Sequence, residues 1–173
     1  MERASYRLLV VDDHKANRDL LAALLSEQGH RCTPAGDGVE ALAKISEGKF
    51  DAVITDVVMP NMDGITLTKE IARHYPSLPV MAMTGNSTEY SAETTIAAGA
   101  REFIAKPFSL SEFFIRLHKM MRDHEVLCQV EEKNREVAFN SHRNSLERIE
   151  DLKRETEHLK SQLSSLYYES QPF

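Results

Sequence analysis

Short apolar runs that end in a polar residue recur through the first two thirds of the chain. There are four of them: Leu8–Val11 before Asp12 and Asp13, Val53–Thr55 before Asp56, Pro79–Met83 before Thr84, and Glu102–Ala105 before Lys106. Runs of this length indicate strands of a sheet that is covered on both faces. An unpaired carboxylate in the core is too costly, so we expect these polar residues to converge at the open edge of the sheet.

Amphipathic segments separate these runs. The pattern predicts helices at residues 15–28, 38–46, about 65–75 and 91–98, and one further strand at 30–35, while the strand before Asp56 extends over 50–55. Strands that alternate with helices over short connections predict an α/β fold with a doubly wound, five-stranded parallel sheet. The periodicity predicts apolar faces made by Leu20, Leu21, Leu24 and Leu25 in the first helix and by Val39, Leu42 and Ile45 in the second.

The residues at the expected sheet edge fit phosphoryl chemistry. Three carboxylates without a nearby cysteine or a paired histidine favour Mg²⁺ over zinc. A carboxylate can also act as a nucleophile toward phosphorus, and a lysine and a threonine can bind a phosphoryl group. Each residue could instead be an ordinary cap or turn residue. Five such residues, each at a strand end, favour a shared site.

The chain resembles response-regulator receiver domains over about residues 5–122. The motifs that carry this resemblance are Val11-Asp12-Asp13, Asp56 followed by Met59-Pro60-Asn61-Met62-Asp63-Gly64, Thr84-Gly85, and Lys106-Pro107. The resemblance implies a flavodoxin-like sheet of order 2-1-3-4-5. It also implies a Mg²⁺-dependent signalling switch, not an enzyme that acts on other substrates, with a sensor histidine kinase as phosphoryl donor.

The resemblance also implies a role for each residue of the motifs. Asp56 would be the phospho-acceptor and would help to bind Mg²⁺, with Asp13 as a direct ligand and Asp12 as a water-mediated one. The backbone carbonyl of Val58 would complete the metal shell. The remaining roles are those of Thr84 as the switch hydroxyl, Lys106 as the phosphoryl-binding cation, and Phe103 as the aromatic residue that changes rotamer.

The last third of the chain has a different pattern. Residues 111–168 contain neither proline nor glycine, which predicts an uninterrupted helix on the order of 85 Å long. Apolar residues follow heptad spacing in two stretches that are out of register by one residue: Leu127, Val130, Asn134 and Val137, then Ile149, Leu152, Thr156, Leu159, Leu163 and Leu166. We therefore expect a receiver domain at residues 1–122 and, at residues 123–173, a helical extension that forms a coiled-coil homodimer.

Other interpretations of this extension stay open at this point. It could be a flexible charged linker, or the connector to an enzymatic or DNA-binding output domain. His142 could accept a phosphoryl group in a relay, although an exposed coil histidine is the simpler interpretation; His14 and His74 are also predicted at the surface. With a net charge of −6, no basic block and no long apolar run, we expect no nucleic-acid or membrane binding. Two distant cysteines, Cys32 and Cys128, favour a cytoplasmic location.

Overall fold

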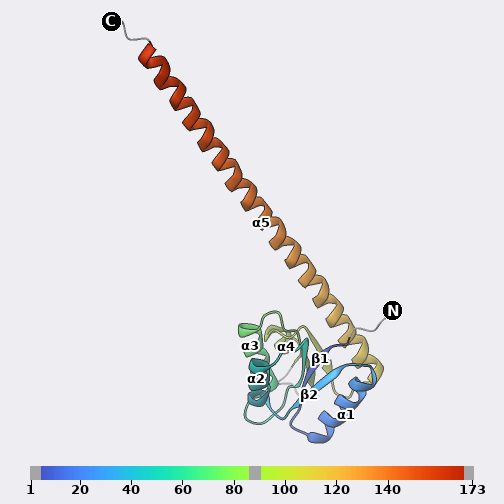
Figure 1. Ribbon diagram of the computed structural model, residues 1–173. Helices are drawn as coiled ribbons and strands as arrows, with labels where there is room; N and C mark the ends of the chain where they lie inside the picture. Colours follow the sequence, from blue (N-terminus) through green and yellow to red (C-terminus); the bar gives the residue numbers. More distant parts are fainter. Residues whose placement is uncertain (1–4, 86–90, 170–173) are drawn as a thin grey trace. The chain divides into compact units, whose positions relative to one another are not determined.

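The computed structural model describes residues 5–85 and 91–169, with side chains up to residue 164. Its centre is a sheet of five parallel strands in the order β2-β1-β3-β4-β5 (Figure 1). The strands are β1 (Arg7–Val11), β2 (Arg31–Ala35), β3 (Ala52–Asp56), β4 (Val80–Thr84) and β5 (Glu102–Ala105). The predicted α/β class, the parallel sheet and the strand order are therefore confirmed.

Within the described residues, these strands are connected or followed by the helices α1 (Lys15–Glu27), α2 (Gly38–Glu47), α3 (Gly64–His74), α4 (Ala92–Ala97) and α5 (Leu110–Glu169). Four of these helices follow a residue whose side chain accepts a hydrogen bond from a backbone N–H of the first turn; these residues are Asp37, Asp63, Ser91 and Ser109. Gly29 and Gly99 follow α1 and α4 and have positive φ angles of 91° and 108°. Glycine is suited to these helix ends because it adopts positive φ without steric cost.

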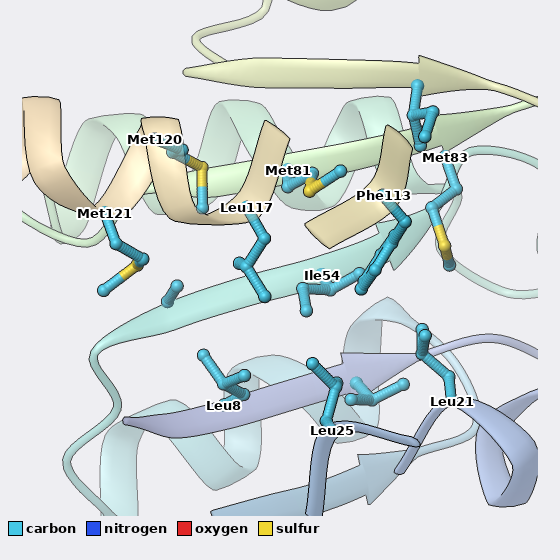
Figure 2. Packing of buried hydrophobic residues seen from close by; sticks show 13 residues of the cluster. Leu8, Leu21, Leu25, Ile54, Met81, Met83, Phe113, Leu117, Met120 and Met121 are labelled. Carbon is cyan, nitrogen blue, oxygen red and sulfur yellow. The ribbon is translucent and has the colours of Figure 1, made fainter. Parts of the chain in front are cut away.

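One face of the sheet packs against α1 and the start of α5. Figure 2 shows Leu8, Ile54 and Met81 of the sheet facing Leu21 and Leu25 of α1 and the side chains of α5. The contribution of α5 comes from four fully or almost fully buried residues, namely Phe113, Leu117, Met120 and Met121. This spacing gives the start of α5 an apolar face toward the sheet, with Phe114 partly buried beside it.

The other face of the sheet packs against α2 and α3, through a cluster that includes Ala41, Ile45, Leu67 and Ile71. Two of the predicted inward residues are wrong, because Leu20 is 62% exposed and Val39 is 53% exposed. The helix α1 meets the sheet through the buried i, i+4 pair Leu21 and Leu25, and α2 meets it through the buried pair Ala41 and Ile45. Leu24 and Leu42 lie at the margins of these faces and are only partly buried.

The chain divides into two compact units, residues 1–125 and 126–173. In the second unit α5 continues without a break to Glu169, and every described side chain at residues 126–164 is exposed. The predicted seam residue Leu166 lies outside the residues whose side chains are described. Over the described ranges, no helix carries an apolar stretch long enough to cross a bilayer.

Candidate functional site

The carboxyl ends of β1, β3 and β5 bring two acids and one lysine together. The Nζ atom of Lys106 lies 2.8 Å from Oδ2 of Asp56 and 3.5 Å from Oδ2 of Asp12. Asp12 is only 1% exposed, so its charge requires compensation. The compensation comes from the backbone N–H of His14 at 2.9 Å and the amide of Asn17 at 3.3 Å, in addition to Lys106.

The β1–α1 turn holds the second acid of the pair. Asp13 is more exposed than Asp12, and its Oδ1 lies 2.8 Å from Nδ1 of His14. The guanidinium of Arg18 donates to the backbone carbonyls of both Asp12 and Asp13 and thereby fixes the turn. Asn17 and Arg18, which support this turn, were not predicted from the sequence. Their position in the first turn of the helix that follows the acids was the available signal.

The loop after Asp56 packs tightly against the strand that it leaves. The backbone N–H of Val57 donates to Oδ1 of Asp56 at 2.7 Å and orients that carboxylate. Gly64 lies so close to the Asp56 carbonyl that a Cβ atom there would overlap it. Asn61 adopts a φ of 62° and donates to Asp37 at 2.7 Å, tying the loop to the start of α2.

The hydrogen bond from Asn61 to Asp37 also affects the ionisation of Asp37. Its pKa lies below its ordinary value, first because the backbone N–H of Glu40 donates to it, and then because Asn61 does. Both hydrogen bonds favour the ionised carboxylate. The loop that carries Val58 and Met59 is therefore held at two points: the N–H of Gly64 donates to the carbonyl of Val57, and Asn61 donates to Asp37 at the start of α2.

The two predicted switch residues lie at the end of β4 and on β5. Thr84 is 5% exposed, and its carbonyl accepts the backbone N–H of Lys106 at 2.6 Å. Phe103 is partly buried, and the guanidinium carbon of Arg116 lies 5.7 Å from its ring centroid. In the register of β4 with β5, Phe103 pairs with Ala82, two residues before Thr84. Side chains two apart share a face, so Thr84, Ala82 and Phe103 lie on the same side of the sheet.

A largely apolar cavity of about 330 Å³ opens beside the acids. Its walls come from α1 and from the segment between β5 and α5, and they include Leu20, Leu21, Leu24, Pro107, Phe108 and Leu110. Asp12 and Lys106 also line it. The exposed Leu20, which the periodicity placed in the core, thus borders a cavity that leads to the site.

The donor set fits Mg²⁺. In the part of the chain that the structure describes, one group of three potential ligands stands close together: Asp12, Asp13 and His14, with one ligand atom of each within 4.8 Å of the others. Asp56 reaches the same edge through the shared contact with Lys106. Val58, in the loop after Asp56, is 55% exposed, so its side chain is not part of the core. Hard carboxylate oxygens at a partly exposed edge are suitable ligands for Mg²⁺.

Comparison with known proteins places this geometry in a family. The response regulator MprA of Mycobacterium ulcerans is 36% identical over 118 residues, which are 68% of this chain and 51% of MprA. The sensor histidine kinase RcsC of Salmonella typhimurium is 42% identical over 103 residues, 60% of this chain and 11% of RcsC. The chain therefore spans about half the length of one curated relative and a small part of the other.

A solved structure shows the same fold. The response regulator protein TrrA of Thermotoga maritima, in complex with Mg²⁺ and BeF, matches with a TM-score of 0.61 and 32% identity over 66% of this chain and 97% of that one. The model of the response regulator receiver domain matches residues 8–118. With its parallel sheet of order 2-1-3-4-5 and its acids at the sheet edge, the chain belongs to the response regulator receiver domain family.

Proposed function

We propose that this chain is a phospho-accepting signalling switch in which Asp56 receives a phosphoryl group from a sensor histidine kinase. The observation that carries the proposal is the position of Lys106, whose ammonium lies 2.8 Å from Asp56 and 3.5 Å from Asp12. A cation in that place can bind the oxygens of a phosphoryl group on Asp56. Labelling by acetyl phosphate tests this assignment. In this proposal residues 1–122 form the receiver domain and residues 123–173 form its helical extension.

The transfer itself needs little covalent machinery. An oxygen of the Asp56 carboxylate attacks the phosphorus and forms a P–O bond. The P–N bond to the donor imidazole breaks, and its electron pair stays on the nitrogen. Lys106 neutralises part of the charge on the phosphoryl oxygens, and the N–H of Val57 keeps the carboxylate oriented. Asp12, Asp13, Asp56 and the carbonyl of Val58 would bind Mg²⁺, which supplies further charge neutralisation when bound.

The phosphoryl state would be transmitted through Thr84 and Phe103. A phosphoryl oxygen on Asp56 attracts the Thr84 hydroxyl, and the small side chain of Ala82 leaves space on the same face for the Phe103 ring. An inward movement of the ring would end its contact with Arg116, which is also paired with Glu102 at 3.1 Å on the neighbouring surface. The surface made by β5 and α5 would therefore change.

We expect Thr84→Ala to be phosphorylated normally and to fail to move the aromatic residue. The chain has no tryptophan, so Phe103→Trp provides a single fluorescent reporter. Beryllium fluoride with Mg²⁺ should shift its emission, and adding Thr84→Ala should remove most of that shift. A full shift in the double variant would show that Thr84 does not couple the two sites. Labelling of that variant by acetyl phosphate serves as the control for an intact acceptor.

The apolar cavity beside the acids supports a docking surface for the kinase. Its Leu20 is 62% exposed on α1, and burial of one leucine side chain is worth roughly 1.5–3 kcal/mol. Leu20→Gln should therefore slow phosphotransfer from a histidine kinase about tenfold or more, since each 1.4 kcal/mol is a factor of about ten. Labelling by acetyl phosphate, which needs no docking surface, should stay unchanged.

The matched control for this docking test is Val39→Gln. Val39 is 53% exposed on α2, which packs on the opposite face of the sheet from α1. If Leu20→Gln and Val39→Gln slow phosphotransfer from the kinase equally, the cavity is not the docking surface for the kinase. We also propose a cytoplasmic location for the switch, which is favoured by the presence of only two cysteines, Cys32 and Cys128, far apart in the sequence.

We further propose that the extension joins two copies of the chain in a parallel coiled coil. Ile149, Leu152, Leu159 and Leu163 share one face of α5 and are each 46–67% exposed. With Ile149 and Leu152 as the first two core positions, Glu155 of one copy faces the partner's Lys160 across a parallel seam. An antiparallel pairing would instead bring lysines at the corresponding flanking positions together. Asn134 in the first seam also favours a parallel two-stranded register.

The second candidate is a connector to an output domain. It is favoured by the coverage of the curated relatives, because the matched segment is 51% of MprA and 11% of RcsC. In that case the exposed face of α5 would pack against another part of a longer protein, not against a second copy. The oligomeric state of the chain distinguishes these two functions: a dimer that depends on the extension supports the coiled coil, and a monomer supports the connector.

A further inference from the structure

The imidazole of His14 lies against the carboxylates that are proposed to bind the metal. Its Nδ1 is 2.8 Å from Oδ1 of Asp13 and 3.8 Å from Oδ1 of Asp12. His14 precedes α1 directly, so its backbone is held by the same turn that positions both acids. The ring is 72% exposed.

These separations match those of ligands on one cation. Ligand bonds of about 2.1 Å in octahedral geometry place neighbouring ligand atoms about 3 Å apart and opposite ones about 4.2 Å apart. The two distances from Nδ1 of His14, 2.8 Å to Oδ1 of Asp13 and 3.8 Å to Oδ1 of Asp12, lie close to that range. A cation between them would replace the hydrogen bond from the ring to Asp13 by two bonds to the metal.

An imidazole changes which cations the site prefers. Mg²⁺ favours oxygen ligands and retains its waters, whereas imidazole nitrogen is a good ligand for first-row transition metals. We infer that His14, through Nδ1, is a direct ligand in the metal site of this chain, and that the site therefore binds Mn²⁺ and related transition-metal dications more tightly than Mg²⁺. This inference rests on the proposed metal site at Asp12, Asp13 and Asp56.

The test measures Mn²⁺ and Mg²⁺ binding by calorimetry and nitrogen coupling by pulsed EPR of bound Mn²⁺. The wild-type chain should show imidazole nitrogen coupling, and His14→Gln should abolish it. His14→Gln should also weaken Mn²⁺ binding roughly tenfold or more, since removal of even an outer-shell partner costs about that much. Its affinity for Mg²⁺ should change by much less. Selective labelling of histidine with ¹⁵N assigns the coupling to an imidazole.

The matched control is His74→Gln, which removes a different exposed histidine whose Nε2 lies 3.4 Å from a carboxylate oxygen of Glu70. That variant should behave like the wild type. Mn²⁺ binding that requires Asp13 but shows no imidazole coupling and no effect of His14→Gln would overturn the inference and leave the metal site intact. If Asp13→Asn weakens the binding of neither Mn²⁺ nor Mg²⁺, both this inference and the proposed Mg²⁺ site are wrong.

Discussion

Replacement of Asp56 by alanine is expected to abolish labelling of the chain by acetyl phosphate. The substitution removes the only carboxylate that contacts Lys106 at 2.8 Å among the described residues, and with it the nucleophile. The neighbouring Asp12 cannot substitute for it, because its oxygens accept from His14 and Asn17 and it is almost fully buried. Labelling should fall to background, measured by incorporated phosphoryl groups per chain.

The control for this prediction is Asp123→Ala. Asp123 is an exposed carboxylate of α5, and its closest recorded cation is Lys119 at 3.9 Å. Its removal should leave labelling unchanged. Circular dichroism should show that both variants keep the fold, so that a loss of labelling reports chemistry and not unfolding. Stoichiometric labelling of Asp56→Ala would mean that another residue accepts the phosphoryl group.

The second large effect concerns the extension, where Leu159→Asp combined with Leu163→Asp should convert a dimer into a monomer. These changes remove four buried leucines per dimer, worth at least roughly 6 kcal/mol in total before ordering costs are subtracted. A loss of that size weakens the dissociation constant by roughly four orders of magnitude. Sedimentation at tens of micromolar should show a dimer for the wild type and a monomer for the variant, with labelling at Asp56 retained.

A control variant on the opposite face of the helix distinguishes loss of the seam from a general effect of two added aspartates on the helix. Arg154→Asp combined with Ser161→Asp also introduces two aspartates, but at positions that face away from the predicted seam. This variant should remain a dimer. A wild-type chain that is monomeric at tens of micromolar would favour the connector function of the extension. A dimer that survives deletion of residues 128–173 would show that the receivers themselves hold the pair.

Much of the fold follows from local pattern. The strands that end at Val11, Asp56 and Thr84 belong to a parallel sheet that is covered on both faces. A strand buried on both faces is apolar along most of its length, so its sequence can be recognised as a continuous apolar run. The helix faces were less predictable, because periodicity places Leu20 beside Leu21 without saying how narrow the contact with the sheet will be. Leu20 lies over a cavity instead of the sheet, and only the packing of the segment 107–110 reveals that.

The site was predictable as a set of residues but not as a set of contacts. Strand ends at one edge follow from parallel topology, which is why Asp12, Asp56 and Lys106 could be grouped from the sequence. The pairing of Lys106 with Asp56, the support of the turn by Arg18 and the approach of His14 to Asp13 depend on side-chain directions within α1 and the loops. Sequence spacing does not determine these directions.

Chemical trapping identifies the residue that carries the phosphoryl group. Borohydride reduces an aspartyl phosphate to homoserine, which marks the acceptor permanently for peptide mass spectrometry. After treatment of the wild-type chain with acetyl phosphate and Mg²⁺ and then with borohydride, we expect homoserine at position 56 and at no other aspartate. Homoserine at position 12 or 13, or a phosphoryl group on His142 with position 56 unmodified, would contradict this expectation.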